Sequence, residues 1–202
     1  WGGGIRAPEH HSEANESIFT NVPGLRVVMP SSPARAYGLL LAAIRDPDPV
    51  IYMEPKRIYR QYKELVPDDG EALPLDVCFV LRDGTDVTLV TWGAQVKETL
   101  EAAEKLAAEG ISAEVIDVAT LKPLDFPTIG ESVAKTGRCV IVHEAPQPSA
   151  FASSCPLTPR PVSAPDSPVA AHPRGPAHPP PLPSAVTPSP AVCSLTSHWP
   201  SP

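Results

Sequence analysis

The sequence predicts an α/β fold with a mostly parallel sheet, arranged as two consecutive modules and followed by a tail of different composition. Short apolar runs alternate with amphipathic stretches in residues 1–146, which is the pattern of strands joined by helical crossovers. The last 56 of the 202 residues contain 16 prolines and one acidic residue, whereas the first 146 contain 12 prolines and 22 acidic residues. A Pro-rich segment without aliphatic clusters cannot offset the entropy lost on ordering, so we predict that residues 147–202 are disordered.

The first module reads as one βαβ unit. Residues 25–30 (LRVVMP) form a short apolar run that is typical of a strand buried in a parallel sheet. Ser31–Pro33 supplies an N-cap and a first-turn proline for a helix over 34–45. The sequence DPDP at 46–49 ends that helix, and residues 50–53 form the next strand.

The second module begins after a polar connection. Residues 55–74 are charged and contain proline and glycine, so they indicate an interdomain connection with its linker at 61–73. The strands predicted at 77–82 and 87–91 flank Asp83-Gly84, which is a hairpin-turn signal.

The rest of the second module continues the alternation. We predict a helix, a strand, a second helix and a last strand at 97–109, 113–117, 127–135 and 139–143. Gly110 is expected to end the first of these helices, and Asp125 is placed to cap the second.

Composition excludes several classes of protein. The first 146 residues carry 14 basic and 22 acidic side chains, which argues against nucleic-acid binding. No stretch approaches the ~20 apolar residues of a membrane span. Trp1 is not a natural start, so we expect the sequence to begin inside a longer protein. The four cysteines have no metal-ligand spacing and indicate free thiols in a reducing compartment: Cys78, Cys139, Cys155 and Cys193.

Four places carry side chains that could do chemistry, and each keeps an ordinary structural alternative. Gly2–Gly4 could cradle a phosphate, but no strand precedes it, so a flexible loop is preferred. In Glu9–Glu13 (EHHSE) one imidazole among carboxylates could donate a proton, or the histidines could be incidental. Asp46 and Asp48 offer oxygen ligands for a hard cation, or they are solvated charges at a helix end. His143-Glu144 ends a strand, where α/β proteins often place functional groups, or it is an ordinary terminus.

Several separated runs resemble one family in the right order. They are GGGIRAPEHHSE at 2–13, VPGLRVVMP at 22–30, AAIRDPDP at 42–49, EPKRIY at 54–59, GTDVTLV at 84–90, GISAEVID at 110–117 and SVAKTGR at 132–138. Together they resemble the beta subunit of the thiamine diphosphate-dependent component of 2-oxo acid dehydrogenase complexes, of the pyruvate or branched-chain type. The resemblance ends near HEAPQ at 143–147, and we expect the tail beyond it to come from a shifted reading frame.

The resemblance assigns domains and site residues. It implies the later part of a transketolase-like pyrimidine-binding domain at 1–60 and a truncated transketolase C-terminal domain at 74–146. His11 matches the family's active-site histidine, which assists acyl transfer to the lipoyl group, and His10 stands where the family varies. Ala43, Asp46 and Asp48 match a structural potassium site that uses mainly backbone carbonyls. The glutamate that activates the cofactor's aminopyrimidine ring would lie upstream of Trp1.

The implied activity is oxidative decarboxylation of a 2-oxo acid with acyl transfer to lipoamide. The implied cofactors are thiamine diphosphate, with magnesium held by an alpha subunit, and potassium. The implied partners are that alpha subunit, in an alpha2-beta2 heterotetramer, and a lipoyl-bearing acyltransferase core. We expect this chain alone to be inactive, and its location to be the bacterial cytoplasm or, in a eukaryote, the mitochondrial matrix. Two alternatives stay open: a transketolase or deoxyxylulose-phosphate synthase, which we expect to be one long chain, and a non-enzymatic product of a truncated gene.

Overall fold

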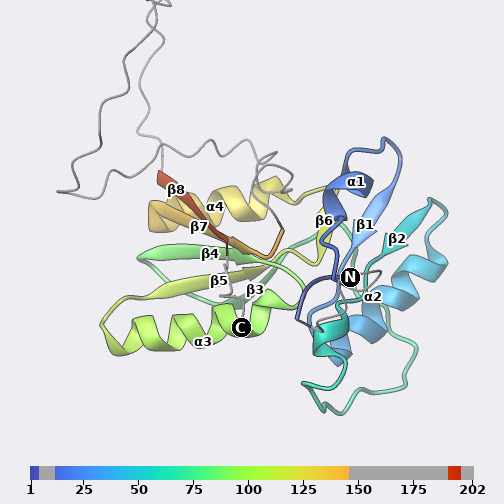
Figure 1. The fold of residues 1–202 in the computed structure, drawn as a ribbon, viewed down its shortest axis with the longest axis horizontal. Helices are drawn as coiled ribbons and strands as arrows, with labels where there is room; N and C mark the ends of the chain where they lie inside the picture. The colour runs from blue at the N-terminus through green and yellow to red at the C-terminus, as the bar shows by residue number, and fades with distance from the viewer. Residues whose placement is uncertain (5–11, 146–190, 197–202) are drawn as a thin grey trace, which may run out of the picture.

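The computed structural model describes residues 1–4, 12–145 and 191–196, the last range as backbone only. Two sheets lie side by side in it (Figure 1). The first has the strand order β2 (Val50–Tyr52), β1 (Arg26–Val28) and β6 (Thr120–Lys122). The second has the order β3 (Phe79–Arg82), β5 (Ala113–Asp117), β4 (Val87–Thr91), β7 (Arg138–His143) and β8 (Ala191–Thr196). None of the helices in these ranges has the length and apolar character that crossing a membrane requires.

The predicted βαβ unit is confirmed. Strands β1 and β2 pair in parallel, and α2 (Pro33–Arg45) connects them. The side chain of Ser32 caps α2 by accepting a hydrogen bond from the backbone N–H of Arg35 at 3.4 Å, and Pro33 occupies the first turn. Two short helices were not predicted, because each has less than two turns and no apolar period to reveal it: α1 (Glu16–Thr20) and the 3-10 helix η1 (Lys56–Ile58).

A strand from the second half of the chain completes the first sheet. β6 pairs antiparallel with β1, with Val28 opposite Thr120 and Val27 opposite Lys122. Sequence analysis missed β6 because three residues are too few to show a strand period. The two modules are therefore joined by a backbone ladder as well as by their connecting chain.

The second sheet has a helix on each face. Figure 1 shows α3 (Gln95–Ala108) and α4 (Phe126–Thr136) on opposite sides of the five strands. β4 pairs in parallel with both β5 and β7, as expected for helical crossovers. The predicted cap is confirmed, since the Asp125 carboxylate accepts a hydrogen bond from the N–H of Thr128 at 3.1 Å.

The predicted hairpin at Asp83-Gly84 is wrong. β3 and β4 do not pair with each other, because β5 lies between them and pairs antiparallel with β3 and parallel with β4. The connection instead crosses the start of β5, where the N–H groups of Thr85 and Asp86 donate to the carbonyl of Ser112. A Cβ on Gly84 would lie 2.2 Å from the backbone N of Glu114. This glycine therefore permits a close backbone crossing and not a two-residue turn.

The connection between the modules packs along α2. Leu73 lies against Gly38, where a Cβ would be 2.5 Å from the Leu73 Cγ. The N–H of Gly70 donates to the Tyr37 hydroxyl at 2.9 Å, and Arg45 donates to the Gly70 carbonyl at 2.9 Å. The polar residues that indicated a connection thus hold it on the helix surface.

One part of the tail differs from the expectation of disorder. Ala191–Thr196 forms β8, parallel to β7, with Arg138 opposite Ala191 and His143 opposite Thr196. These six residues (AVCSLT) contain no proline, so each of their backbone N–H groups can form a hydrogen bond between strands. The prediction of disorder was based on the composition of the whole Pro-rich tail and therefore did not distinguish this segment. The rest of 147–202 lies outside the described residues.

The largest core cluster joins both modules. Val27 and Met29 from the first module are fully buried against Trp92, Ile116 and Leu121 from the second. Among the described residues, Cys78 and Cys139 are not joined by a disulfide, and Cys155 and Cys193 lie where no side chain is described. Because this core cluster contains buried side chains from both modules, it leaves little room for the two modules to move independently.

Candidate functional site

The histidine segment is described only at its two ends. His10 and His11 fall in residues 5–11, outside the described residues. The residues on either side of the segment meet, because the N–H of Gly2 donates to the carbonyl of Glu13 at 3.1 Å. We call Gly2–Gly4 with Glu13 the glycine base. These residues lie at the described ends of the segment.

The carboxylate of Glu144, just after β7, lies against the glycine base. A Cβ on Gly2 would be 2.6 Å from Glu144 Oε1, and the φ of Gly2 is +86°. A side chain at this position would need a shift of the Glu144 carboxylate and a strained backbone. The backbone N–H of Gly3 and the side chain of Gln95 lie close enough to the Glu144 carboxylate to oppose the rise of its pKa. The three glycines therefore allow close approach to a carboxylate, an alternative that sequence analysis did not consider.

Arg57 supports the other side of the glycine base. A Cβ on Gly4, whose φ is +92°, would lie 2.2 Å from the Arg57 Cδ. The guanidinium donates to Glu98 Oε1 at 2.5 Å and to the Ala94 carbonyl at 3.0 Å. This contact joins η1 of the first module to the start of α3 in the second.

A second acid, Glu16 at the start of α1, is fully buried nearby. Its Oε2 accepts a hydrogen bond from the indole Nε1 of Trp1 at 2.8 Å. Burial raises the pKa of Glu16, and the charge of Glu144 adds to the rise. Burial likewise raises the pKa of Glu144, although Arg57 opposes it. Two carboxyls that each resist ionisation thus lie beside the ends of the histidine segment.

His143, the last residue of β7, stacks on Trp92. Its imidazole lies parallel to the Trp92 indole, with ring centroids 5.6 Å apart and an interplanar angle of 7°. Burial lowers the pKa of His143, so the neutral imidazole is favoured. Its Nδ1 is buried without a hydrogen-bond partner among the described residues. Of this pair, the structure therefore places Glu144 beside Gly2 and Gly3, while His143 stacks on Trp92.

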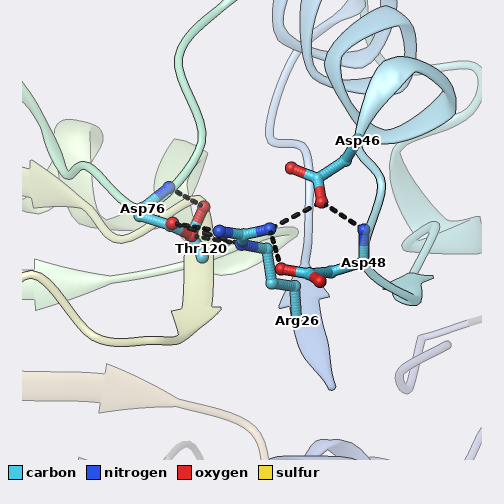
Figure 2. Close-up of polar contacts among 5 residues, drawn as sticks. All are labelled: Arg26, Asp46, Asp48, Asp76 and Thr120. Atoms are coloured by element: carbon cyan, nitrogen blue, oxygen red, sulfur yellow. Dashed lines mark hydrogen bonds and ion pairs between the residues drawn. The ribbon is translucent and has the colours of Figure 1, made fainter. Parts of the chain in front are cut away.

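The acidic turn after α2 is neutralised by an arginine. Figure 2 shows Arg26 between Asp46, Asp48 and Asp76. Its Nη1 lies 2.6 Å from Asp46 and 3.0 Å from Asp48, so the cation that these carboxylates contact is a guanidinium. The described residues contain no group of three or more His, Cys, Asp or Glu side chains that could hold a metal. Potassium on the backbone carbonyls of Ala43, Asp46 and Asp48 stays a prediction.

The glycine base does not fit the diphosphate end of thiamine diphosphate. Arg57, the cation that contacts it, is already bonded to Glu98. The carboxyls of Glu16 and Glu144 close to it would repel a phosphate when ionised. The described residues fit a different task, which is to hold the two ends of the segment that contains His11.

The histidine segment and the strand-end acid could be identified from the sequence, but their partners could not. Glu16, Arg57 and Gln95 could not be identified because most of their neighbours are distant in the sequence. Arg57 lies 37 residues from Ala94 and 41 from Glu98, and Gln95 lies 49 residues from Glu144. Glu16 is 15 residues from Trp1. Glu144 was singled out only by its position after a strand. The pairing of a glycine run with a distant strand-end carboxylate is a three-dimensional signal that no spacing in the sequence carries.

Comparison with known families divides the chain in two. The family "Transketolase, pyrimidine binding domain" matches residues 1–61, and "Transketolase, C-terminal domain" matches residues 77–157. The glycine base and Arg57 lie in the first match, and Glu144 lies in the second. The site therefore sits where the two domains meet.

Curated relatives match most of this chain. The chain is 54% identical over 144 residues to "Pyruvate dehydrogenase E1 component subunit beta" of Acholeplasma laidlawii, covering 71% of this chain and 44% of that protein. It is 44% identical over 154 residues to the subunit of the same name in Bacillus subtilis, covering 76% and 47%. The chain thus spans about half the length of these relatives.

A solved structure agrees with the fold. The structure of "Split gene transketolase, inactive beta4 tetramer" matches with a TM-score of 0.58 and 31% identity, over 67% of this chain and 44% of that one. The chain therefore belongs to the family of 2-oxo acid dehydrogenase E1 beta subunits and contains the junction of a transketolase-type pyrimidine-binding domain and C-terminal domain.

Proposed function

We propose that this chain is part of the beta subunit of a thiamine diphosphate-dependent pyruvate dehydrogenase. The observation that carries the proposal is the glycine base, which closes the segment containing His11 and is held by residues of both domains. The names of the relatives from Acholeplasma laidlawii and Bacillus subtilis support pyruvate as the substrate. Branched-chain 2-oxo acids are the alternative that the assay below separates.

The role proposed for this chain is to position an imidazole. His11 would move a proton while the acyl group passes to lipoamide, because an imidazole changes protonation near neutral pH. The cofactor and its magnesium would be held by an alpha subunit and by residues outside the described ranges. The proposed assembly is an alpha2-beta2 heterotetramer that works on a lipoyl-bearing acyltransferase core.

Transketolase is the second candidate, favoured by the solved structure. Chain length does not separate the two candidates, contrary to the expectation from sequence, because the solved protein is itself a split gene transketolase. The substrates do separate them: a transketolase moves a two-carbon unit between sugar phosphates and needs no lipoyl group.

A chimera tests the proposal. Residues 1–145 replace the matching segment of the Acholeplasma laidlawii subunit, which is then assembled with its own alpha subunit. We expect pyruvate-dependent acylation of a lipoyl domain, weaker turnover of branched-chain 2-oxo acids and no transfer between sugar phosphates. The same chimera with His11→Ala is the control. An assembled chimera that binds thiamine diphosphate but acylates no lipoyl domain would overturn the proposal.

A further inference from the structure

A cavity of about 280 Å³ lies on the first module. Pro30, which follows β1, and Glu54, which follows β2, both line it. The cavity therefore lies at the carboxyl ends of two parallel strands, where α/β sheets commonly bind ligands. No residue of the glycine base lines it. Its wall is mainly apolar and includes two tyrosines, Tyr59 and Tyr62, and two further prolines, Pro33 and Pro55.

The groups around this cavity disfavour an anionic ligand. The cavity adjoins the start of α2, but two N–H groups of the first turn are already bonded. Ala34 donates to Glu64 at 3.1 Å, and Arg35 donates to the Ser32 hydroxyl at 3.4 Å. No described lysine or arginine lines the cavity, and the one charged side chain in its wall is that of Glu54. A phosphate or carboxylate would meet like charge there without free donors.

The Glu54 carboxylate has no cation as a partner. It makes no ion pair with any described residue. The α-ammonium of Trp1 contacts the backbone carbonyl of Glu54, at 3.0 Å, and not its carboxylate. The Tyr59 hydroxyl donates to Glu54 Oε2 at 2.5 Å. This bond raises the pKa of Tyr59 to about 12, so the phenol stays neutral and the negative charge stays on the carboxylate.

The two tyrosines suit the apolar part of a cation. Tyr59 is 56% exposed and Tyr62 is half-buried, so a ligand can reach the Tyr59 ring from solvent. Aromatic rings attract cations through their negative faces, and alkylammonium groups are recognised in this way. The prolines add apolar surface that alkyl groups can cover. A carboxylate beside aromatic side chains in an apolar cavity therefore fits an alkylated ammonium group.

We propose that this cavity binds a small alkylated ammonium ion, with its charge beside Glu54 and its alkyl groups against Tyr59 and Tyr62. A volume of about 280 Å³ lies just under the ~300–1,000 Å³ of sites for drug-sized ligands, so the ligand is a free cation of few atoms. The binding is independent of the proposed function, because it uses neither the histidine segment nor a cofactor.

Choline is the probe, and the full 202-residue chain is the protein. The neutral analogue 3,3-dimethyl-1-butanol has nearly the same shape without the charge. We expect saturable binding of choline by calorimetry and about 10-fold weaker binding of the analogue. The N-methyl proton signal of bound choline should move upfield, because aromatic rings shield protons that lie over their faces. No saturable binding of choline, or equal binding of both compounds, would overturn the proposal in the unmodified chain.

Variants of the cavity test the two parts of the site. Glu54→Gln removes the charge but keeps an acceptor for Tyr59, and it should lower the affinity for choline about 2- to 5-fold, as for an exposed charge pair. Tyr59→Leu should lower the affinity about 2- to 30-fold and reduce the upfield shift. Tyr59→Phe keeps the ring and should retain both the affinity and the shift.

A second tyrosine–carboxylate pair supplies the matched controls. The Tyr37 hydroxyl, on α2, donates to Asp68 Oδ1 at 3.0 Å, and neither residue lines the cavity. Asp68→Asn and Tyr37→Leu should therefore leave the affinity for choline unchanged. Losses as large as those in Glu54→Gln and Tyr59→Leu would overturn the placement of the ligand.

A protein side chain could present the same chemistry as a free cation. A short peptide with one trimethylated lysine carries the same head group on a polypeptide. We expect this peptide to bind more weakly than choline, because the cavity has room for a few atoms only. Tighter binding of the peptide would assign the cavity to a protein partner and overturn the proposal of a free cation.

Discussion

The guanidinium of Arg35, on α2, donates a hydrogen bond from Nε to the Asp117 carboxylate, at the end of β5, over 2.9 Å. Ser31 donates to the same oxygen of Asp117 at 2.5 Å. Asp117 is fully buried, and Arg35 also lies over the Phe79 ring with its Cζ 4.2 Å from the centroid. One carboxylate of the second domain therefore receives two donors from the first.

Loss of Asp117 should destabilise both domains together. Asp117→Ala leaves Arg35 and Ser31 without their acceptor, and breaking a buried pair costs about 3 kcal/mol or more. We expect a lower urea midpoint in a single transition. Asp83→Ala is the control, because Asp83 pairs with Lys135 at an exposed site, and its midpoint should hardly move. A similar midpoint for both variants would contradict the role given to Asp117.

Replacement of His11 should separate acyl transfer from cofactor binding. In the assembled chimera, His11→Ala should slow acylation of the lipoyl domain by ~10²–10⁴, the usual contribution of a positioned proton donor. Calorimetry should give an unchanged affinity for thiamine diphosphate. His10→Ala should be milder, and full turnover in His11→Ala would make this histidine an incidental loop residue.

Glu16 should make stability fall as pH rises. Burial raises its pKa above the ordinary 4.5, so between these two values the folded state holds a proton that the unfolded state has lost. The contribution of Glu16 to folding stability is therefore fully present below pH 4.5 and is lost as pH rises through the raised pKa. In Glu16→Gln this contribution is absent, so the variant should gain stability relative to wild type with increasing pH. Parallel stability curves for the two proteins would refute the assignment.

The predicted potassium site can be tested without changing the carboxylates of Asp46 and Asp48. Because Arg26 already pairs with Asp46 and Asp48, a bound cation would depend on backbone carbonyls, including that of Ala43. We expect a higher melting temperature in potassium chloride than in sodium chloride at equal ionic strength, because binding to the folded state adds stability. Equal melting temperatures in the two salts would contradict the prediction of a potassium site. Asp48→Asn, at an exposed side chain, should keep the difference between the salts.

Local signals predicted the elements well. Ser32 and Asp125 could be identified as helix caps because a cap needs only one side chain and a backbone N–H three residues later. Asp83-Gly84 misled because a hairpin and a chain crossing both need a glycine, and only the partner strand tells them apart. Here the backbone of Ala113 and Glu114, about thirty residues later in the sequence, lies against Gly84, so the glycine serves a chain crossing.

The candidate site was predictable only in part. His143-Glu144 stood at a strand end and the glycine run was visible, but nothing in their spacing joined residue 2 to residue 144. Arg26 is similar: it lies in a strand, and its ion pairs reach Asp46, Asp48 and Asp76, at sequence separations from 20 to 50. Such pairs form because sheet pairing brings distant segments together, which composition and periodicity do not encode.

The ladder between β1 and β6 has a consequence for the covalent chain. The connection near the exposed Leu65 could be cut without releasing the two parts, because a strand of the second already belongs to the sheet of the first. A nicked chain should migrate as one particle and separate only in denaturant. By the same reasoning, the two parts expressed as separate polypeptides should find each other and assemble.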